Sequence, residues 1–454
     1  MRESGGRPEL ARARKRLGMN QEEAAEALLI TPTTLSRWER GTQDIRPVYR
    51  ARIAQVFGVS GAEVERWLHG TDPVATDLWP LPNFSDLSIT ATVESAEKFW
   101  RGELDLDRRH LLAALPFVPA ALNAWLSEWS YGASVVSAAS QGAARAVGHS
   151  DVVRVTEMWR TLSQIDHLYG SRIARPAVVD YMNTEVTPLL RGTYDDKVGA
   201  ELLAAAAGMT SFLGWTAFDL ANHGQAQHYY GQALKFAKIA DDPLTGAHVL
   251  TAMTRQAIHL GQSDYAAMLG RATVESARQG GATPRVMALM LAREAWTTAL
   301  RARPSRTRDR HSAKRVQRLI GEAEHAYAQG PSDADPYWIR HYDEPELRAE
   351  LGWARLHLGA HDQAIADSEH AVHEFLVARP RSAQLNRVTV ANAYLDKQEV
   401  EQAVAVIRAV PAANTQASPR LMESIRQFDK RLSPYEKNVQ VREFRAYLDQ
   451  QLAS

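Results

Sequence analysis

Residues 31–41, TPTTLSRWERG, place hydroxyl and guanidinium groups along one side of a short predicted helix. The Thr-Pro pair at its start supplies an N-cap and a first-turn proline, and the final glycine supplies a stop. Leu35 and Trp38 recur at helical spacing and are expected to face inward. The other side can donate hydrogen bonds to phosphates and base edges in the DNA major groove, which admits one helix. Its candidate contact residues are Thr31, Thr33, Thr34, Ser36, Arg37 and Arg40.

A second short helix is predicted immediately before this one. Asn20 is a good N-cap, and two glutamates follow in the first turn, where carboxylates favour the positive end of a helix. Ala24, Ala25 and Leu28 then recur at helical spacing, and a tight turn is expected at residues 29–30. The segment therefore predicts two helices joined by a turn, the second carrying the polar face.

The run from Arg12 to Gly41 resembles the helix-turn-helix of the phage-repressor/Cro type, also called the xenobiotic-response-element (XRE) family. The resemblance extends from Arg7 to Leu68 and implies five helices, with the fourth at 47–57 and the fifth at 61–68. It implies that the N-terminal segment binds double-stranded DNA. The alternative is that the same fold is retained only for protein contacts, as an interaction scaffold.

The same resemblance implies a role for each matching residue. Gln21, at the start of the second helix, would bind a phosphate and brace the third helix. Trp38 and Glu39 would be structural, with Glu39 paired to Arg12 or Arg14. Thr33, Thr34 and Arg37 would reach base edges, and Ser36 would be a phosphate contact. Pro32 removes a backbone donor and leaves direct readout to fewer residues.

Composition limits the remaining possibilities. The 454-residue chain has 53 basic and 53 acidic residues and no cysteine, which excludes disulfides and cysteine ligands and favours a reducing, cytoplasmic compartment. No apolar run is long enough to suggest a membrane partner. Residues 1–70 contain twelve Lys/Arg and nine Asp/Glu, a local net charge of about +3. The first and third helices hold Arg12, Arg14, Lys15, Arg16, Arg37 and Arg40, which could neutralise phosphates.

The chain is long for one core and predicts several units, all of them α-helical. The expected units are a helix-turn-helix domain at 1–70, a linker and bridging helix at 71–106, a helical bridging region at 107–192 and a helical repeat domain at 193–454. Within the bridging region, 107–131 and 134–147 are expected to be helical. No segment reads as a convincing strand.

Small residues recur along the last unit in the pattern of a degenerate tetratricopeptide (TPR) repeat, in which they let paired helices pack closely. The equivalent positions are Gly214, Thr254, Ala292, Gly352 and Ala391, separated by about 40, 38, 60 and 39 residues. These spacings exceed the ideal of roughly 34. The widest gap contains the basic stretch 301–318, expected to be an exposed loop entering a helix, with a second nucleic-acid contact as the alternative. The fold class is therefore all-α, a helix-turn-helix domain followed by a TPR-like α-solenoid.

This domain order resembles a group of actinobacterial transcriptional regulators and, in architecture, the peptide-pheromone receptors of Gram-positive bacteria. The resemblance implies a sensing role for the solenoid. Arginines that clamp carboxylates, an asparagine and aromatic side chains would suit a peptide, a small molecule or a protein partner. The residues predicted for the inner wall are Trp215, Arg255, Arg293, Trp353 and Asn392. In the alternative interpretation the two tryptophans fill the core, as do the next inward positions Phe218, Ile258, Trp296, Leu356 and Leu395.

No sequence motif indicates an enzyme: there is no Gly-rich phosphate loop, nucleophile elbow or HExxH motif. His357 and His361 are four apart but straddle Gly359, where a helix is expected to end, so no metal site and no cofactor are predicted. A homodimer is expected, because a single helix-turn-helix covers one half-site of an inverted repeat. The C-terminal helices between 419 and 452 are one candidate for the dimer surface.

Overall fold

The computed structural model of the chain describes residues 8–43, 45, 49, 52–53, 56–57, 79–84, 86–132, 137–141, 145–302, 310–410 and 418–453. The chain forms two compact units: residues 1–80 with 114–116, and residues 81–113 with 117–454. Among the described residues, regular structure is helical apart from two strands of two residues each. The fold is all-α, with an N-terminal helix-turn-helix followed by helical repeats, which confirms the predicted fold class.

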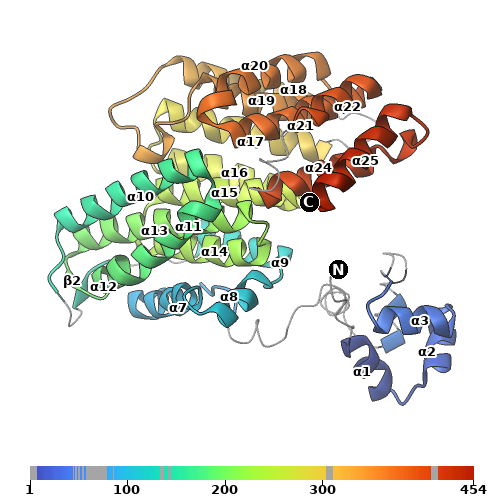
Figure 1. The fold of residues 1–454 in the computed structure, drawn as a ribbon. Helices are drawn as coiled ribbons and strands as arrows, with labels where there is room; N and C mark the ends of the chain where they lie inside the picture. Colours follow the sequence, from blue (N-terminus) through green and yellow to red (C-terminus); the bar gives the residue numbers. More distant parts are fainter. Residues whose placement is uncertain are drawn as a thin grey trace. The chain divides into compact units, whose positions relative to one another are not determined.

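The N-terminal unit contains helices α1 (Pro8–Arg16), α2 (Gln21–Leu28) and α3 (Pro32–Glu39), shown in Figure 1. Asn20 caps α2 in a capping box with Glu23, as its residue type predicts. Thr31 caps α3, and the turn between the helices passes through Leu29 in the left-handed region, at φ 54°. Of the predicted fourth helix only Tyr49, Arg52, Ile53, Val56 and Phe57 are described, and the predicted fifth helix lies outside the described residues.

The apolar faces of these helices meet in one small core. Leu35 and Trp38 of α3 are almost fully buried, as their spacing predicts, and Trp38 packs against the ring of Tyr49 with centroids 5.2 Å apart. The polar face of α3 is therefore held on a packed support. The other buried residues of this core are Leu10, Ala13, Ala24, Ala25, Leu28, Ile45, Ile53 and Phe57.

The second unit begins with helices that pack on the repeats. They are α7 (Ile89–Gly102), α8 (Leu106–Ala113), α9 (Pro119–Tyr131), α10 (His149–Tyr169), α11 (Ser171–Tyr181), a π-helical turn at Met182–Val186, and α12 (Thr187–Leu190). The helix predicted over 107–131 is two helices, because Pro116 and Pro119 interrupt it. The helix predicted over 134–147 is wrong where the segment is described. Strand β1 (Ser140–Gln141) pairs there with β2 (Thr193–Tyr194) in antiparallel register.

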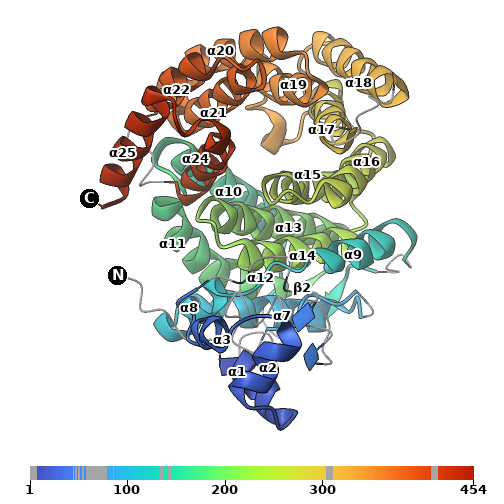
Figure 2. The ribbon, with the colours of Figure 1, turned by 90° about the vertical axis from the view of Figure 1, so that its right-hand side faces the viewer.

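The repeats are helical hairpins that follow one another around an arc (Figure 2). Their helices are α13 (Asp196–Asp219) with α14 (His223–Ile239), α15 (Pro243–His259) with α16 (Ser263–Gln279), α17 (Pro284–Ala302) with α18 (Arg310–Ala328), α19 (Glu344–Leu358) with α20 (His361–Ala378), and α21 (Pro380–Asp396) with α22 (Val400–Arg408). A 3-10 turn at Tyr337–Ile339 precedes α19, another at Ser433–Tyr435 follows α24 (Pro419–Arg431), and α25 (Val439–Ala453) ends the described chain.

Close approach of paired helices explains the small residues of the repeat. A Cβ atom added to Gly214 would lie 2.6 Å from the ring of Tyr230 on the partner helix, and one added to Gly352 would lie 2.6 Å from Ser368 Oγ. The equivalent positions Thr254, Ala292 and Ala391 are fully buried. The wide interval from Ala292 to Gly352 contains most of the long α17–α18 hairpin and the segment with the 3-10 turn. These insertions make the repeat spacing irregular, but the two helices of each hairpin still pack together.

The predicted bridging region packs on the repeats within the same compact unit. Trp129 of α9 lies against Gly246 and donates a hydrogen bond to Ser276 Oγ over 2.7 Å. Trp159 of α10 lies against Gly208 of α13. Bulky indole rings facing glycines show that these surfaces are matched in shape, so the bridging helices form part of the repeat domain's core.

Helix α13 is the one described helix long and apolar enough, by length and composition, to cross a membrane. In the fold, 72% of its apolar window is buried inside the domain, where it contacts α10, α11, α14 and α15. Its apolar character is accounted for by this packing.

A buried histidine makes the stability of this domain depend on pH. His228 of α14 is 3% exposed and stacks on Phe99 of α7, and burial lowers its pKa to about 3. In the unfolded chain it takes up a proton near pH 6.5, so acidification favours unfolding between these two pKa values. Lowering the pH from 7 to 5 is expected to remove about 2 kcal/mol of stability through this residue. In urea unfolding at both pH values, His228→Leu should lose that share of the pH dependence. An unchanged pH dependence in the variant would contradict this assignment.

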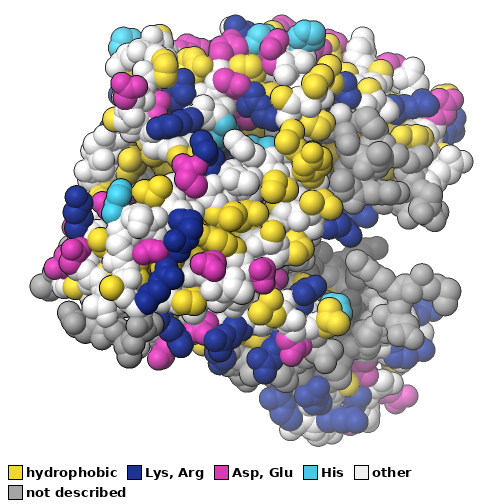
Figure 3. Space-filling view, turned by 60° about the vertical axis from the view of Figure 1, so that its left-hand side comes forward, with side chains coloured by type: hydrophobic (Ala, Val, Ile, Leu, Met, Phe, Trp, Pro, Cys, Tyr) yellow, Lys and Arg dark blue, Asp and Glu magenta, His cyan; other side chains and the backbone are white. Residues whose placement is uncertain are grey.

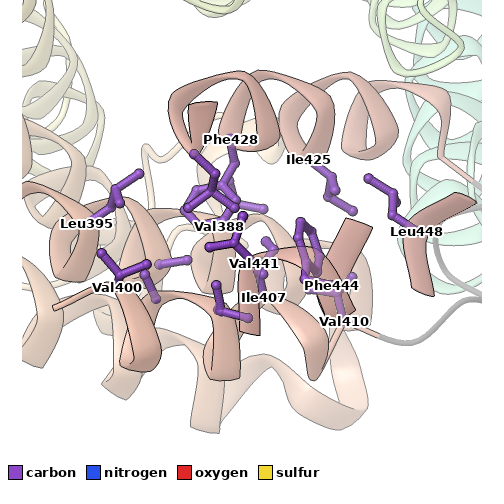
Figure 4. Close-up of a cluster of buried hydrophobic side chains, with 14 of the residues drawn as sticks. Val388, Leu395, Val400, Ile407, Val410, Ile425, Phe428, Val441, Phe444 and Leu448 are labelled. Carbon is purple, nitrogen blue, oxygen red and sulfur yellow. The ribbon is translucent and has the colours of Figure 1, made fainter. Parts of the chain in front are cut away.

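The last helices build an apolar core of their own with α21 and α22. Figure 4 shows Ile425 and Phe428 of α24 and Val441 and Phe444 of α25 pointing into it. The rings of Phe428 and Phe444 meet edge to face, with centroids 6.4 Å apart. The apolar side chains of the predicted dimer surface are thus largely used within the chain.

Candidate DNA-binding face and central cavity

The predicted DNA-contacting residues of α3 lie on the exposed side of the helix. Thr33, Arg37 and Arg40 are exposed, whereas Ser36 is half-buried. Arg40 donates to the backbone carbonyl of Ser36, while the Arg37 side chain has no hydrogen bond or ion pair with any described residue. Arg37 is therefore the guanidinium of α3 that is available to an incoming base or phosphate.

The start of α3 is occupied with capping. Thr31 Oγ1 accepts a hydrogen bond from the backbone nitrogen of Thr34, and the two threonine hydroxyls lie 2.9 Å apart. Pro32 stands at the first position of the helix, where no backbone donor is needed within the helix. The hydroxyls of Thr31 and Thr34 thus position the helix end as well as facing outward.

A buried network braces α3 from both neighbouring helices. Glu39 accepts from Arg14 Nε and from Gln21 Nε2, each over 2.7 Å. Arg14 also donates to the backbone carbonyl of Met19. Arg14 is thereby the pairing partner of Glu39, and Gln21 braces α3, as the family resemblance implies.

This network removes one residue from the expected phosphate contacts. Arg14 is 8% exposed and paired to Glu39, so it is not available to neutralise a phosphate. In contrast, Arg12, Lys15 and Arg16 of α1 are exposed. Burial of Arg14 follows from its side of α1, which also carries the buried Leu10.

Comparison with known families identifies this unit. Residues 10–64 match the helix-turn-helix family model. A comparison with curated proteins found no match. The match begins within α1 and covers all of α2 and α3, and it supports DNA binding by the N-terminal unit in general. It does not extend to the repeats.

Three arginines in the described part of the basic stretch 301–318 pair with acidic residues of their own domain. Arg301 contacts Asp264, Arg315 contacts Glu294, and Arg318 contacts Glu322. The basic and acidic side chains of the domain are interspersed over the face shown in Figure 3. This pairing favours the interpretation of the stretch as ordinary surface.

In the helical domain, the first and last inner helices meet and close the arc into a ring. Helices α13, α15, α17, α19, α21 and α24 each contact the next, and α24 contacts α13. Asp219, fully buried at the end of α13, accepts from Arg381 of α21 over 2.7 Å and pairs with Arg420 of α24 at 3.3 Å. We call this arrangement the inner ring.

The inner ring lines a pocket of about 240 Å³, together with α10 and the turn before α19, and a neighbouring pocket of about 270 Å³. Of the predicted inner-wall residues, Trp215, Arg255, Arg293 and Trp353 line the first cavity. Asn392 lines the second, together with Arg255 and Trp353. All five residues therefore line one of two neighbouring cavities, although Trp215 and Asn392 are four hairpins apart in the chain.

Four of these five side chains have polar partners in the protein, including Arg255 with Glu350 and Trp353, whose Nε1 donates to Thr389 Oγ1. Arg293 is 4% exposed and makes a bidentate pair with Glu350, with N–O distances of 2.8 and 2.6 Å. Asn392 donates to the backbone carbonyl of Val388 and accepts from Arg431. These contacts favour a structural role for Arg293 over its expected role as a ligand clamp, because Glu350 and the backbone carbonyl of Thr251 already accept from its donors.

The next inward row is mostly core. Phe218, Trp296, Leu356 and Leu395 are buried, and Leu395 belongs to the C-terminal apolar cluster. Ile258 is half-buried. The second cavity is lined by four residues of this row, Phe218, Ile258, Trp296 and Leu356. Their packing agrees with the core interpretation of this row.

Two arginines of the cavities, the half-buried Arg255 and the buried Arg420, keep unused donors among the described residues. Arg255 makes one contact of 3.2 Å to Glu350, whose oxygens already hold Arg293. Arg420 makes one contact of 3.3 Å to Asp219, and its buried Nε has no hydrogen-bond partner among the described residues. Burial lowers the pKa of both guanidinium groups. Both line both cavities.

Aromatic rings hold these two guanidinium groups in place. Arg255 lies 4.1 Å from the ring centroid of Trp353, and Arg420 lies 4.8 Å from that of Trp215. Arg420 was missed by the sequence analysis, as were Arg379 and Arg381 of the same cavity, because α24 and the start of α21 lie outside the repeat positions that were compared. In the sequence these three arginines stand among other charged residues, so nothing local distinguishes them from surface arginines.

Proposed function

We propose that the protein is a sequence-specific transcriptional regulator that binds operator DNA through α3 and binds a small anionic effector in the inner ring. The exposed Arg37 on the braced helix α3 supports the first part. Such a regulator would act in the cytoplasm and would need neither a cofactor nor a catalytic group. The alternative is an interaction scaffold that does not use its helix-turn-helix fold on DNA.

A gel-shift titration against genomic fragments distinguishes these two functions. The regulator should bind particular promoter fragments, and its affinity should fall steeply with salt because phosphate contacts release counterions. A scaffold would give no footprint at any promoter at low salt, including the promoter of its own gene.

The unused donors of Arg255 and Arg420 support the class of effector. Arg420 Nε is a buried donor without an acceptor among the described residues, which costs about 1–3 kcal/mol that an anionic ligand would recover by accepting from it. Planar guanidinium groups match carboxylate and phosphate oxygens, and the surrounding tryptophans suit an apolar or aromatic body. The closed ring and the size of its cavities favour a small molecule or a short peptide end over a long extended peptide.

Aromatic carboxylates and their matched neutral amides test this effector class by thermal shift. Carboxylates that fit should raise the melting temperature of the full chain, whereas the amides should not. Arg255→Met and Arg420→Met should each abolish the shift, and both should fold because Glu350 and Asp219 keep their other arginine partners. Equal shifts with acids and amides would argue for an apolar ligand instead.

We further propose that the regulator binds as a homodimer to inverted half-sites about one helical turn apart. Sedimentation of the chain with and without operator DNA tests this proposal. A monomer under both conditions would contradict it. An effector that binds the DNA-competent dimer differently from the free chain should change operator affinity by roughly 5- to 150-fold.

A further inference from the structure

Three potential metal ligands converge where the inner ring closes. His223 is the first residue of α14, His259 is the last residue of α15, and Glu423 lies on α24. The Nε2 atoms of the two histidines lie 3.0 and 2.8 Å from the same carboxylate oxygen, Glu423 Oε2. All three ligand atoms lie within 4.8 Å of one another.

The surroundings hold the two imidazole rings toward the carboxylate. The Phe218 ring lies 5.8 Å from that of His223 and 5.4 Å from that of His259. Gln256 donates to the backbone carbonyl of His223 over 2.7 Å. The side chains are 14% (His223), 11% (His259) and 32% (Glu423) exposed, so an ion can reach the cluster from solvent.

Two imidazole nitrogens and one carboxylate oxygen form a donor set typical of Zn²⁺ sites that keep a fourth position for water. The nitrogen-rich set disfavours Ca²⁺ and Mg²⁺, which prefer oxygen ligands. With metal–ligand bonds of about 2.0–2.1 Å, tetrahedral ligand atoms lie roughly 3.3 Å apart. Each of the two nitrogen–oxygen distances, 3.0 and 2.8 Å, would therefore need to lengthen by only about half an ångström or less for an ion to replace the shared protons.

We propose that His223, His259 and Glu423 bind a divalent transition-metal ion, represented by Zn²⁺. The ion would join α14 and α15 to α24, which carries Arg420 one turn before Glu423. The ion would therefore cross-link the helices where the inner ring closes and stabilise that closure. The ligands are 200 and 164 residues apart in the sequence, so no short motif predicts the site. This inference does not depend on the proposed regulatory function.

Metal titration of the tag-free, full-length chain tests the site. After treatment with chelator, calorimetry with Zn²⁺ should show one ion per chain. Co²⁺ should give the visible absorption of a four-coordinate ion, which reports the ligands directly. Zn²⁺ should raise the melting temperature by a few degrees, and chelator should reverse the rise.

Isosteric variants identify the ligands. Glu423→Gln keeps the shape and can still accept from a histidine but lacks the negative charge, and it should lower Zn²⁺ affinity at least tenfold. His259→Gln should do the same. His149→Gln is the matched control, because His149 pairs with Glu201 over 2.7 Å with no third ligand among the described residues, and the variant should bind Zn²⁺ like the parent. No binding at micromolar Zn²⁺, or equal affinity in all variants, would overturn the proposal.

Discussion

Replacing Glu350 with alanine is expected to lower the free energy of unfolding of the helical domain by about 3–5 kcal/mol. Glu350 is 4% exposed in its side chain and accepts hydrogen bonds from Nε and Nη2 of Arg293, and it also contacts Arg255. Removing the carboxylate leaves the buried guanidinium of Arg293 on α17 and the half-buried one of Arg255 on α15 without this acidic partner. Urea unfolding followed by circular dichroism measures the loss.

An exposed ion pair provides the control for this prediction. Arg318 and Glu322 pair on α18 at side-chain exposures of 67% and 43%, so Glu322→Ala should change stability by no more than about 0.5 kcal/mol. Similar losses in the two variants would show that the buried network contributes no more than surface charge. The stabilising role of Glu350 would then have to be abandoned.

Arg37→Ala is expected to weaken operator binding by about 1–3 kcal/mol, or roughly 5- to 150-fold, if its guanidinium reads a base edge. Arg37 is exposed on α3 and pairs with no described residue, so its removal should leave the fold intact. Binding isotherms on the operator and on unrelated DNA measure the effect. The loss should be concentrated on the operator.

The pattern of the loss identifies the type of contact. A single common factor on every DNA sequence, with a shallower salt dependence, would mean that Arg37 contacts a phosphate. Arg160→Ala is a suitable control, because Arg160 is a half-exposed arginine of the helical domain paired with Glu157 and should leave DNA affinity unchanged.

Local signals in the sequence predicted the elements that depend on neighbouring residues. Asn20 and Thr31 cap the helices as expected, because a cap needs only the backbone two or three positions ahead. Small residues at 214 and 352 predicted hairpins, because close helix packing excludes a side chain there. The helix expected over 134–147 failed where β1 pairs with β2, since strand pairing depends on a partner far along the chain.

The sequence by itself determined the helix-turn-helix, the all-α class and the five inner-wall positions, because periodicity and capping act within one or two helical turns. Only the tertiary structure decided which charges remain available. It paired Arg14 with Glu39 and Arg293 with Glu350, and it left Arg255 with unused donors. Which residues form ion pairs, and where the inner ring closes, depends on side chains brought together from distant helices. The spacing of these residues in the sequence does not predict that they meet.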